Sequence, residues 1–145
     1  MIISNDNDLE LATRLRLAVT RMARRLRQHS DHELSPSLTA ALSTIERLGP
    51  LTPSALAEAE RIQRPTATRI AARLAEAGLV ERAVDERDRR VARLAITAEG
   101  RRTLKAIRSR KTAYLARRIE RLDPADRELL ARATDVLERM LDEDA

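Results

Sequence analysis

Prolines divide this sequence into segments that have room for short helices. A proline is tolerated in the first turn of a helix but breaks a helix that contains it further along. Four of the five prolines stand where a helix can begin, and three of these follow a good N-cap residue, namely Ser35, Thr52 and Asp123. Gly49 and Gly78 stand where the preceding helices would end in a left-handed residue. The four prolines are Pro36, Pro53, Pro65 and Pro124.

The spacing of apolar residues agrees with this division. Leu11, Leu15, Ala18, Met22 and Leu26 recur with the period of a helix, and the strong helix formers Leu and Ala dominate the composition. We therefore expect a mainly α-helical protein. The expected helices are 8–28, 36–48, 53–60, 65–77, a long one from 98 to about 122, and a last one from 124 to about 141.

The helical period gives way to alternation after the fourth helix. The pattern shortens towards alternation in 79–84 and 91–96, with Ala92, Leu94 and Ile96 on one face of the second segment, whereas all six residues of 85–90 are charged. We interpret this region as a β-hairpin with an exposed tip. A group of short helices followed by a hairpin is typical of a winged helix-turn-helix, so the expected fold class is α+β, mainly α with a small hairpin wing.

Composition excludes several classes of protein. The 145 residues contain no Cys, so neither a disulfide framework nor a thiolate site is available. No apolar run reaches the 18 residues that a membrane helix needs, and residues 1–10 are acidic and polar where a secretory signal would be basic and then apolar. We therefore expect a cytoplasmic protein. The net charge of +5, from 28 Lys and Arg against 23 Asp and Glu, does not by itself identify a partner.

Motifs for catalysis and metal binding are missing from the sequence. It has no Gly-rich phosphate loop, no HExxH and no nucleophilic Ser motif, so we expect neither an enzyme nor a cofactor. The cluster of His29, Asp31, His32 and Glu33 lies at a helix end in a polar linker. A solvated helix terminus is a better interpretation of this cluster than a metal site.

The segment 65–77 has one face suited to packing and one suited to reaching outward. At about 100° per residue, Thr66, Arg69 and Arg73 share an arc of the helix surface. An arginine fork matches the O6 and N7 atoms of guanine in the major groove, so we expect this face to contact DNA. The residues of the opposite face are Ala67, Ile70, Ala71 and Leu74.

The charged hairpin tip predicts a second contact with DNA. Arg87, Arg89 and Arg90 suit the narrow minor groove, whose negative potential attracts arginine. Acidic residues at the same tip oppose this contact, so we expect Asp88 to turn inward, pair with Arg73 or Arg89, and stabilise the wing.

Phosphate contacts are expected beside these two elements. The hydroxyls of Thr52 and Ser54, at the start of the helix 53–60, and the side chain of Arg64 are the candidates. The alternative is that charged helix faces and hairpin tips are simply solvated. Only the joint arrangement of a two-faced helix, a hairpin and a basic tip favours DNA binding.

Six short motifs follow one another through the middle of the chain. They are 51–57 (LTPSALA), 64–69 (RPTATR), Leu74, 78–82 (GLVER), 88–90 (DRR) and 94–100 (LAITAEG). Together they resemble the signatures of the MarR (multiple antibiotic resistance regulator) family of transcription factors. The turn 60–63 (ERIQ) departs from the family pattern, in which a Gly or Asn is common.

The resemblance implies a dimeric winged-helix DNA binder, usually a repressor, that recognises a pseudo-palindrome. By position, Thr66, Thr68, Arg69 and Arg73 match the recognition helix, and Arg90 matches the wing residue that enters the minor groove. Members of the family often bind small aromatic acids, so the resemblance also implies a small aromatic or amphipathic effector.

The terminal helices have more apolar surface than a small reading domain can cover, and a second copy of the chain is the simplest partner. We therefore expect 1–33 and 98–145 to form a dimerisation region around a DNA-binding domain at 34–97. The alternative is ordinary packing within one chain. The expected dimer residues are Leu11, Leu15, Met22, Leu104, Ile107, Leu115, Ile119, Leu122, Leu130, Ala133, Leu137, Met140 and Leu141.

Charge is unevenly divided between the last two helices. Residues 101–122 hold nine basic residues and one acid, whereas 123–145 hold three basic residues and eight acids. These blocks can pair within or between subunits, or the basic block can lie along DNA phosphates.

The function favoured by the sequence is a homodimeric, sequence-specific transcriptional regulator; the resemblance implies a repressor that a small ligand releases from its operator. The alternatives are a dimeric winged-helix adaptor for protein interactions and a nucleoid-associated protein that binds DNA without sequence preference.

Overall fold

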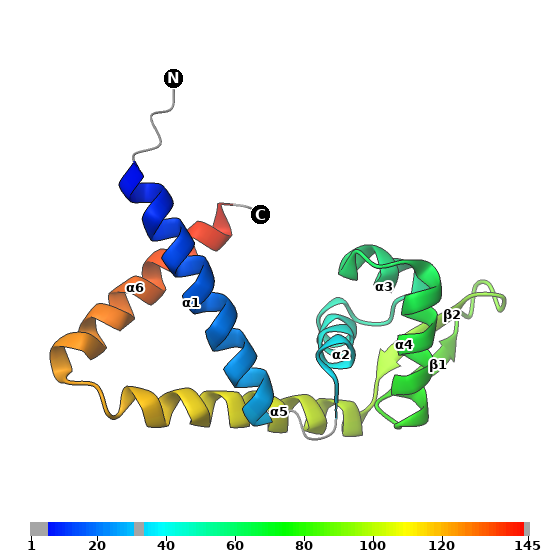
Figure 1. The fold of residues 1–145 in the computed structure, drawn as a ribbon. Helices are drawn as coiled ribbons and strands as arrows, with labels where there is room; N and C mark the ends of the chain where they lie inside the picture. The colour runs from blue at the N-terminus through cyan, green and yellow to red at the C-terminus, as the bar shows by residue number, and fades with distance from the viewer. Residues whose placement is uncertain (1–5, 31–33, 144–145) are drawn as a thin grey trace. The chain divides into compact units, whose positions relative to one another are not determined.

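The computed structural model describes residues 6–30 and 34–143, which form helices and one β-hairpin (Figure 1). The chain divides into two compact units, 1–111 and 112–145, and α5 runs through the division. In chain order the elements are α1 (Asp6–Ser30), α2 (Pro36–Leu48), α3 (Pro53–Glu60), α4 (Arg64–Glu76), β1 (Val80–Val84), β2 (Ala92–Ile96), α5 (Ala98–Ile119) and α6 (Pro124–Asp142).

The helix starts predicted from proline are confirmed. The side chains of Ser35, Thr52 and Asp123 accept hydrogen bonds from backbone N–H groups three residues on, at 3.4, 3.1 and 2.8 Å. Each therefore satisfies a donor that the first turn of its helix leaves unpaired. Gly49 and Gly78 have φ angles of 75° and 74°, the left-handed region that glycine adopts without strain.

The predicted hairpin is also present, with slightly shorter strands than expected. β1 and β2 pair in antiparallel register, from Val80 opposite Ile96 to Val84 opposite Ala92. Leu51 extends this sheet by two backbone hydrogen bonds with Leu94, at 2.7 and 3.1 Å. The strand β2 is therefore tied both to β1 and to the segment that leads into α3.

An aliphatic core holds α4 in place. Contacts join α2 to α3, α4 and β2, and α4 to α3 and β1. Leu104 and Ile107 of α5 are buried in the same core, so our assignment of these two residues to the dimer seam was wrong. They pack within one chain because α5 begins directly after β2, so its first turns lie against the core. The largest fully buried apolar side chains are Leu42, Ile45, Leu56, Leu74, Leu94 and Leu104.

The junction between the hairpin and α5 is unusually tight. The Thr97 hydroxyl donates to the Gly78 carbonyl oxygen at 2.7 Å and accepts from the Gly100 N–H at 3.0 Å. A Cβ atom on residue 100 would overlap the Leu79 carbonyl oxygen and lie 2.7 Å from Ile96 Cγ1. The chain therefore needs glycine at this position for space rather than for its φ angle.

We expect Gly100→Ala to lower the free energy of unfolding by about 1–3 kcal/mol, because overpacking a well-packed site forces backbone shifts. Urea unfolding at fixed protein concentration measures the change, and Arg101→Ala is the control at the exposed neighbour. A free energy within about 0.5 kcal/mol of the unsubstituted protein, the range of ordinary surface substitutions, would contradict the steric argument.

Candidate nucleic-acid interface

The helix α4 is two-faced, as the periodicity predicts. Ala67, Ala71 and Leu74 are fully buried, whereas Arg69 and Arg73 are exposed. The small alanine side chains let the helix lie close to its neighbours in the core. The polar face is therefore held at a fixed orientation by the packing of the opposite face.

Hydrogen bonds orient two of the polar side chains of α4. The Arg69 Nη2 atom donates to Thr66 Oγ1 at 3.4 Å, which steadies the guanidinium along the helix. The Thr68 hydroxyl donates to the Arg64 carbonyl oxygen one turn earlier at 3.0 Å, and this residue is exposed. The exposed surface of α4 therefore offers guanidinium N–H donors and a threonine side chain, which are groups that read base edges.

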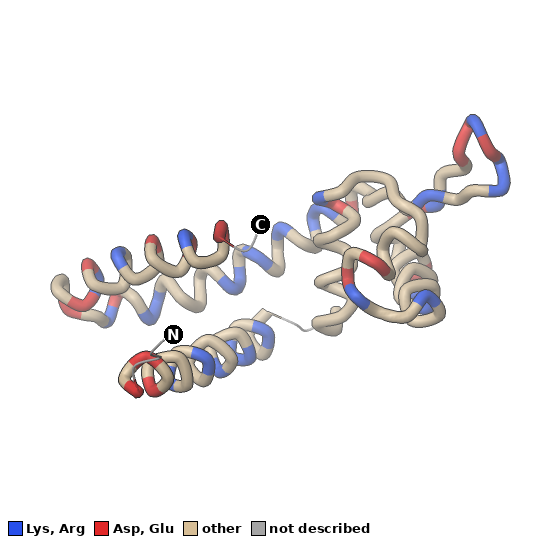
Figure 2. Tube along the Cα trace, turned by 90° about the horizontal axis from the view of Figure 1, so that it is seen from above, with Lys and Arg blue, Asp and Glu red and all other residues tan. Residues whose placement is uncertain are grey.

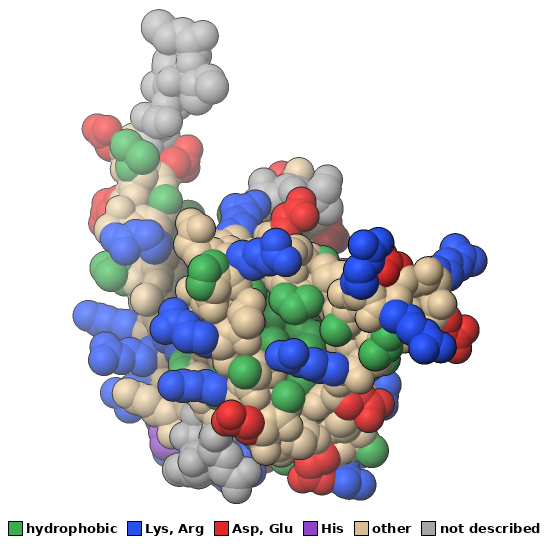
Figure 3. Space-filling view, turned by 90° about the vertical axis from the view of Figure 1, so that its right-hand side faces the viewer, with side chains coloured by type: hydrophobic (Ala, Val, Ile, Leu, Met, Phe, Trp, Pro, Cys, Tyr) green, Lys and Arg blue, Asp and Glu red, His purple; other side chains and the backbone are tan. Residues whose placement is uncertain are grey.

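A shallow groove brings several of the predicted residues together. It has a volume of about 240 Å³ and lies between the start of α2 and the exposed face of α4. Thr66, Arg69 and Arg73 line it from α4, and Ser35 and Ser37 line it from α2. Figure 3 shows basic side chains spread over the face that carries α4 and the hairpin.

The turn between α3 and α4 contains an arginine in the left-handed conformation, in a segment where the family commonly has Gly or Asn. Arg61 has φ 53° and ψ 45°. The Ile62 N–H donates to the Ala57 carbonyl oxygen at 3.0 Å, and the Arg61 N–H donates to that of Glu58 at 3.2 Å. These two bonds form a Schellman cap, in which glycine is the usual left-handed residue.

The start of α3 carries the predicted phosphate ligands. Thr52 is half-buried and its Oγ1 accepts the capping bond, whereas Ser54 is exposed. Arg64 is exposed at the first residue of α4. Thr52 and Ser54 therefore lie at the start of α3, and Arg64 lies at the start of α4, shortly after the turn around Arg61.

Two carboxylates fold the hairpin tip. Asp85 accepts from the backbone N–H of Arg87 at 2.9 Å and from Arg93 Nε at 3.4 Å. Asp88 accepts from the backbone N–H of Arg90 at 3.1 Å and from Arg90 Nε at 3.2 Å. Our expectation that Asp88 pairs with Arg73 or Arg89 was wrong, because the carboxylate meets the residue two positions on in a local Asx turn.

Sequence reasoning missed Asp85 and Arg93 as residues that shape the wing. Their signal was an Asp directly after a strand, which commonly begins a turn, and a basic residue eight positions later on the returning strand. The backbone N–H of Arg87, with help from Arg93, holds the pKa of Asp85 below its ordinary value, against the opposing effect of desolvation.

The tip arginines are exposed at the end of this hairpin. Arg90 is 92% exposed even though it pairs with Asp88. Arg87 and Arg89 are also exposed. Figure 2 shows acidic and basic residues alternating along a tip that projects beyond the helices of its unit. The wing therefore presents basic side chains from a loop whose backbone is already folded.

The candidate metal cluster is only partly visible. Asp31, His32 and Glu33 lie outside the described residues. Among residues 6–30 and 34–143, no group of three or more His, Cys, Asp or Glu side chains is placed to hold a metal ion. Within those same ranges, no helix is long and apolar enough to cross a membrane.

Comparison with known proteins identifies the family. The family model for the MarR family matches residues 34–92. An HTH-type transcriptional regulator from Mycobacterium tuberculosis (strain CDC 1551 / Oshkosh) is 37% identical over 139 residues, which are 95% of this chain and 97% of the relative. A solved structure from Pseudomonas aeruginosa PA01, of a protein assigned as a transcriptional regulator, has 35% identity and a TM-score of 0.84, and the match covers 95% of this chain and 99% of that one.

More distant structures share the fold. A MepR mutant from Staphylococcus aureus, solved bound to an oligodeoxyribonucleotide, is 19% identical with a TM-score of 0.72, and the match covers 90% of this chain and 97% of that one. The fold and the comparisons together define a winged helix-turn-helix transcriptional regulator. The chain belongs to the MarR family, and it is a DNA-binding regulator rather than an enzyme.

Substitution of the left-handed arginine should test the turn. We expect Arg61→Gly to raise the free energy of unfolding by about 0.5–1 kcal/mol. Relief of left-handed strain, roughly 1–2 kcal/mol, exceeds the cost of glycine's extra freedom in the unfolded chain, roughly 0.4–1 kcal/mol. Thermal unfolding measures the change. Arg61→Ala removes the same charge but keeps the Cβ atom, so an equal gain in that variant would refute the strain explanation.

Removal of the first tip carboxylate should loosen the wing locally. In Asp85→Ala we expect faster amide exchange at 85–91 with little change in the melting temperature, because these bonds lie outside the core. Glu86→Ala, at the exposed neighbouring acid, should leave the exchange unchanged.

The pH dependence of the tip follows from the direction of the Asp85 shift. Because its pKa is lowered in the folded protein, the ordering of the tip should be complete above the unfolded value of about 3.9 and lost as the pH falls through the lower folded value. Amide chemical shifts of the tip report this loss, and a change near neutral pH would contradict it.

Proposed function

We propose that this protein is a cytoplasmic, homodimeric repressor that binds a pseudo-palindromic operator and is released from it by a small amphipathic acid. The observation that carries the proposal is that one unit presents two basic elements, the exposed face of α4 and the folded wing tip. The MepR mutant with a bound oligodeoxyribonucleotide, which shares this fold, supports a DNA-binding role.

The major-groove contact is assigned to α4. A helix of 13 residues is about 20 Å long, and B-DNA's major groove admits such a helix. Arg69 and Arg73 supply forks for guanine edges or phosphates, and the methyl group of the exposed Thr68 suits a thymine methyl. Thr66, which receives the Arg69 bond, completes this set.

The wing and the helix starts supply the remaining contacts. Arg87, Arg89 and Arg90 enter the minor groove, where narrow stretches attract arginine. Asp88 keeps Arg90 in position through its bonds to the backbone and the guanidinium. The phosphate contacts are those of Thr52, Ser54 and Arg64, since hydroxyls and basic residues at helix starts suit phosphate oxygens.

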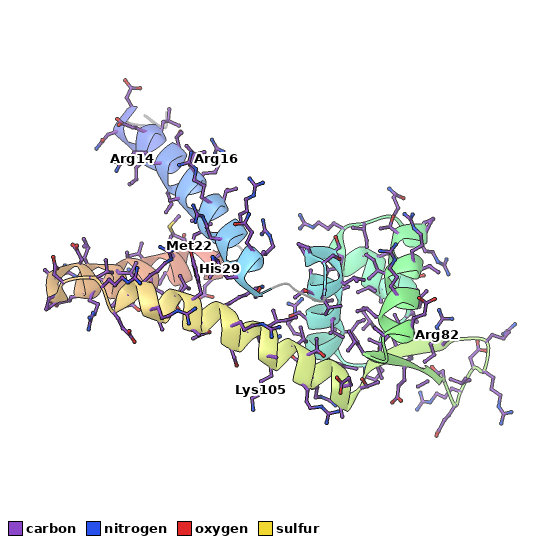
Figure 4. All side chains as sticks on the ribbon, turned by 60° about the horizontal axis from the view of Figure 1, so that its bottom comes forward. Arg14, Arg16, Met22, His29, Arg82 and Lys105 are labelled. Carbon is purple, nitrogen blue, oxygen red and sulfur yellow. The ribbon has the colours of Figure 1, made fainter. Side chains whose placement is uncertain are left out.

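Exposed apolar residues on the terminal helices support a dimer. In one chain Leu11 is 61% and Leu141 is 72% exposed, and Met22 and Leu130 are exposed as well. Figure 4 shows the Met22 side chain projecting from the flank of α1. Leu15 and Leu137, half-buried in one chain, belong to the same proposed seam. A second copy covers such surfaces most simply, with 1–33 and 98–145 as the dimerisation region and 34–97 as the reading domain.

A cavity in the first unit supports the proposal that a small-molecule effector binds. This α2–α5 cavity has a volume of about 490 Å³ and is lined by residues of α1, α2 and α5. Leu26, Leu104 and Ile107 give it apolar walls, and Arg27 and Lys111 add positive charge. Small-molecule sites combine apolar walls with a few polar groups in this way, so the lining suits an amphipathic acid.

Selection of bound fragments from random duplex DNA tests the function. The selected fragments should contain half-sites centred about 10 bp apart or a multiple of it, because a two-fold dimer reads two successive faces of the duplex. Binding to a selected site should exceed binding to scrambled DNA by roughly 10³ or more. No retardation in a gel even at low salt would refute the proposal, and equal retardation of scrambled DNA would favour a nucleoid-associated protein.

Two arginine variants divide the contact between the grooves. We expect Arg69→Ala to cost about 1–3 kcal/mol of binding and to relax base preference at one position in each half-site. Arg90→Ala should weaken binding while leaving that preference intact. Arg47→Ala removes the same charge from an exposed position of α2 and serves as the control. Unchanged affinity in Arg90→Ala, measured by fluorescence anisotropy, would remove the wing from the proposed interface.

A further inference from the structure

A forked ion pair joins α2 and α5 at the edge of the α2–α5 cavity. The Arg108 Nη1 atom donates to Glu46 Oε1 at 2.8 Å, and its Nη2 atom donates to Ser43 Oγ at 3.2 Å. Ser43 and Glu46 are one turn apart on α2, so both face the same neighbour. Arg108 and Ser43 also line the cavity. One guanidinium therefore belongs both to the contact between two helices and to the wall of a ligand-sized space.

The charges around this space are unbalanced. Arg27, Arg108 and Lys111 line the cavity, and none of its described lining residues is acidic. Glu46 is not a lining residue of the cavity, but it forms an ion pair with Arg108, one of these three basic residues. An organic anion that enters the cavity therefore meets positive charge, although one of the basic groups, Arg108, is already paired with the Glu46 carboxylate.

One lining residue of this cavity, Thr39, has a buried polar atom. The Thr39 hydroxyl oxygen is buried and, within the described part of the chain, meets no hydrogen-bond partner. Thr39 lines the cavity from α2, one turn before Ser43. A buried hydroxyl without a partner is costly, and a polar ligand group brought close by a small side-chain movement would satisfy it.

We propose that Arg108 selects anionic ligands for the α2–α5 cavity and that Glu46 competes with the ligand for the Arg108 guanidinium. This inference rests on the proposed release by a small acid. The side chains of Arg108 and Glu46 are 53% and 29% exposed, and partly exposed ion pairs of this kind are weak. A ligand carboxylate can displace the Glu46 carboxylate at small cost, because the Arg108 guanidinium exchanges one carboxylate partner for another.

The exchange has a consequence for the reading unit. Glu46 and Ser43 belong to α2, which packs against α3, α4 and β2. When the ligand takes the guanidinium, α2 loses its polar bonds to α5 while the apolar packing remains. Ligand and DNA are then coupled if the two arrangements of α2 differ in their affinity for DNA, and the coupling acts equally in both directions.

Calorimetry with 2-naphthoate and its neutral counterpart 2-naphthamide, on the whole protein without DNA, tests the competition. Glu46→Gln should bind naphthoate about two- to fivefold more tightly, the range of a weak ion pair, with naphthamide unchanged. Arg108→Gln should lose most of the preference for naphthoate over naphthamide, to which Arg27 and Lys111 still contribute. Glu99→Gln is the matched control, because it removes the same charge from an exposed ion pair with Arg102 on α5 and should change neither affinity.

Three results would overturn the proposal: unchanged or weaker naphthoate binding in Glu46→Gln, an undiminished preference for naphthoate in Arg108→Gln, or no naphthoate binding to the unsubstituted protein at millimolar concentration. If Arg108→Gln fails to fold, Glu46→Gln alone decides, since loss of a merely structural contact would weaken both ligands. Failure of the proposed function would give a different result: the protein would not bind DNA, or naphthoate would bind to the protein without releasing the DNA.

Discussion

The close seating of α4 depends on two alanines. Ala67 and Ala71 are both fully buried, and Leu74 continues the same face one turn on. A larger side chain at either alanine would push the helix away from α2 and α3, because a packed core has no room to absorb added volume. The orientation of Arg69 and Arg73 follows from this contact, since both lie on the opposite side of the same rigid helix.

The wing is positioned by different forces. Its tip is folded by local hydrogen bonds to Asp85 and Asp88, most of them with residues only two positions away. Such bonds are solvent-exposed and can open without unfolding the core, whereas α4 can separate from α2 and α3 only when the core itself unfolds. The two elements proposed to contact DNA therefore differ in stability: one is as stable as the fold, and the other can adjust to the groove that it meets.

Local chemistry explains what could be predicted from the sequence. The caps at Ser35, Thr52 and Asp123 and the two-faced α4 depend on residues within one or two turns, so their patterns were sufficient. Four features depended on tertiary packing or detailed backbone geometry. The burial of Leu104 and Ile107 could be predicted only by knowing that the first turns of α5 pack against the core. The Arg108 bond to Glu46 joins residues 62 positions apart, for which the sequence has no local signal.

One wrong prediction, for Asp88, and one feature that was not predicted, at Arg61, concern local geometry rather than topology. Asp88 was expected to reach a more distant arginine, but a carboxylate at a turn meets the backbone two residues on before it meets anything else. Arg61 takes a conformation usually left to glycine, because the Schellman bonds to Ala57 and Glu58 and the packing of the flanking helices determine its φ angle. The candidate interface residues were nevertheless found from the sequence, since exposure on a known helix face is periodic.

The hydroxyl of Thr97 joins the end of the reading helix to the beginning of α5. It bonds the Gly78 carbonyl oxygen, just beyond α4, and the Gly100 N–H, in the first turn of α5. A rotation of α5 about its own axis therefore displaces the C-terminal end of α4 through two hydrogen bonds and one side chain. In a dimer built from α5, the distance between the two copies of α4 would thus change when α5 rotates, even if neither copy of α4 changes its own conformation.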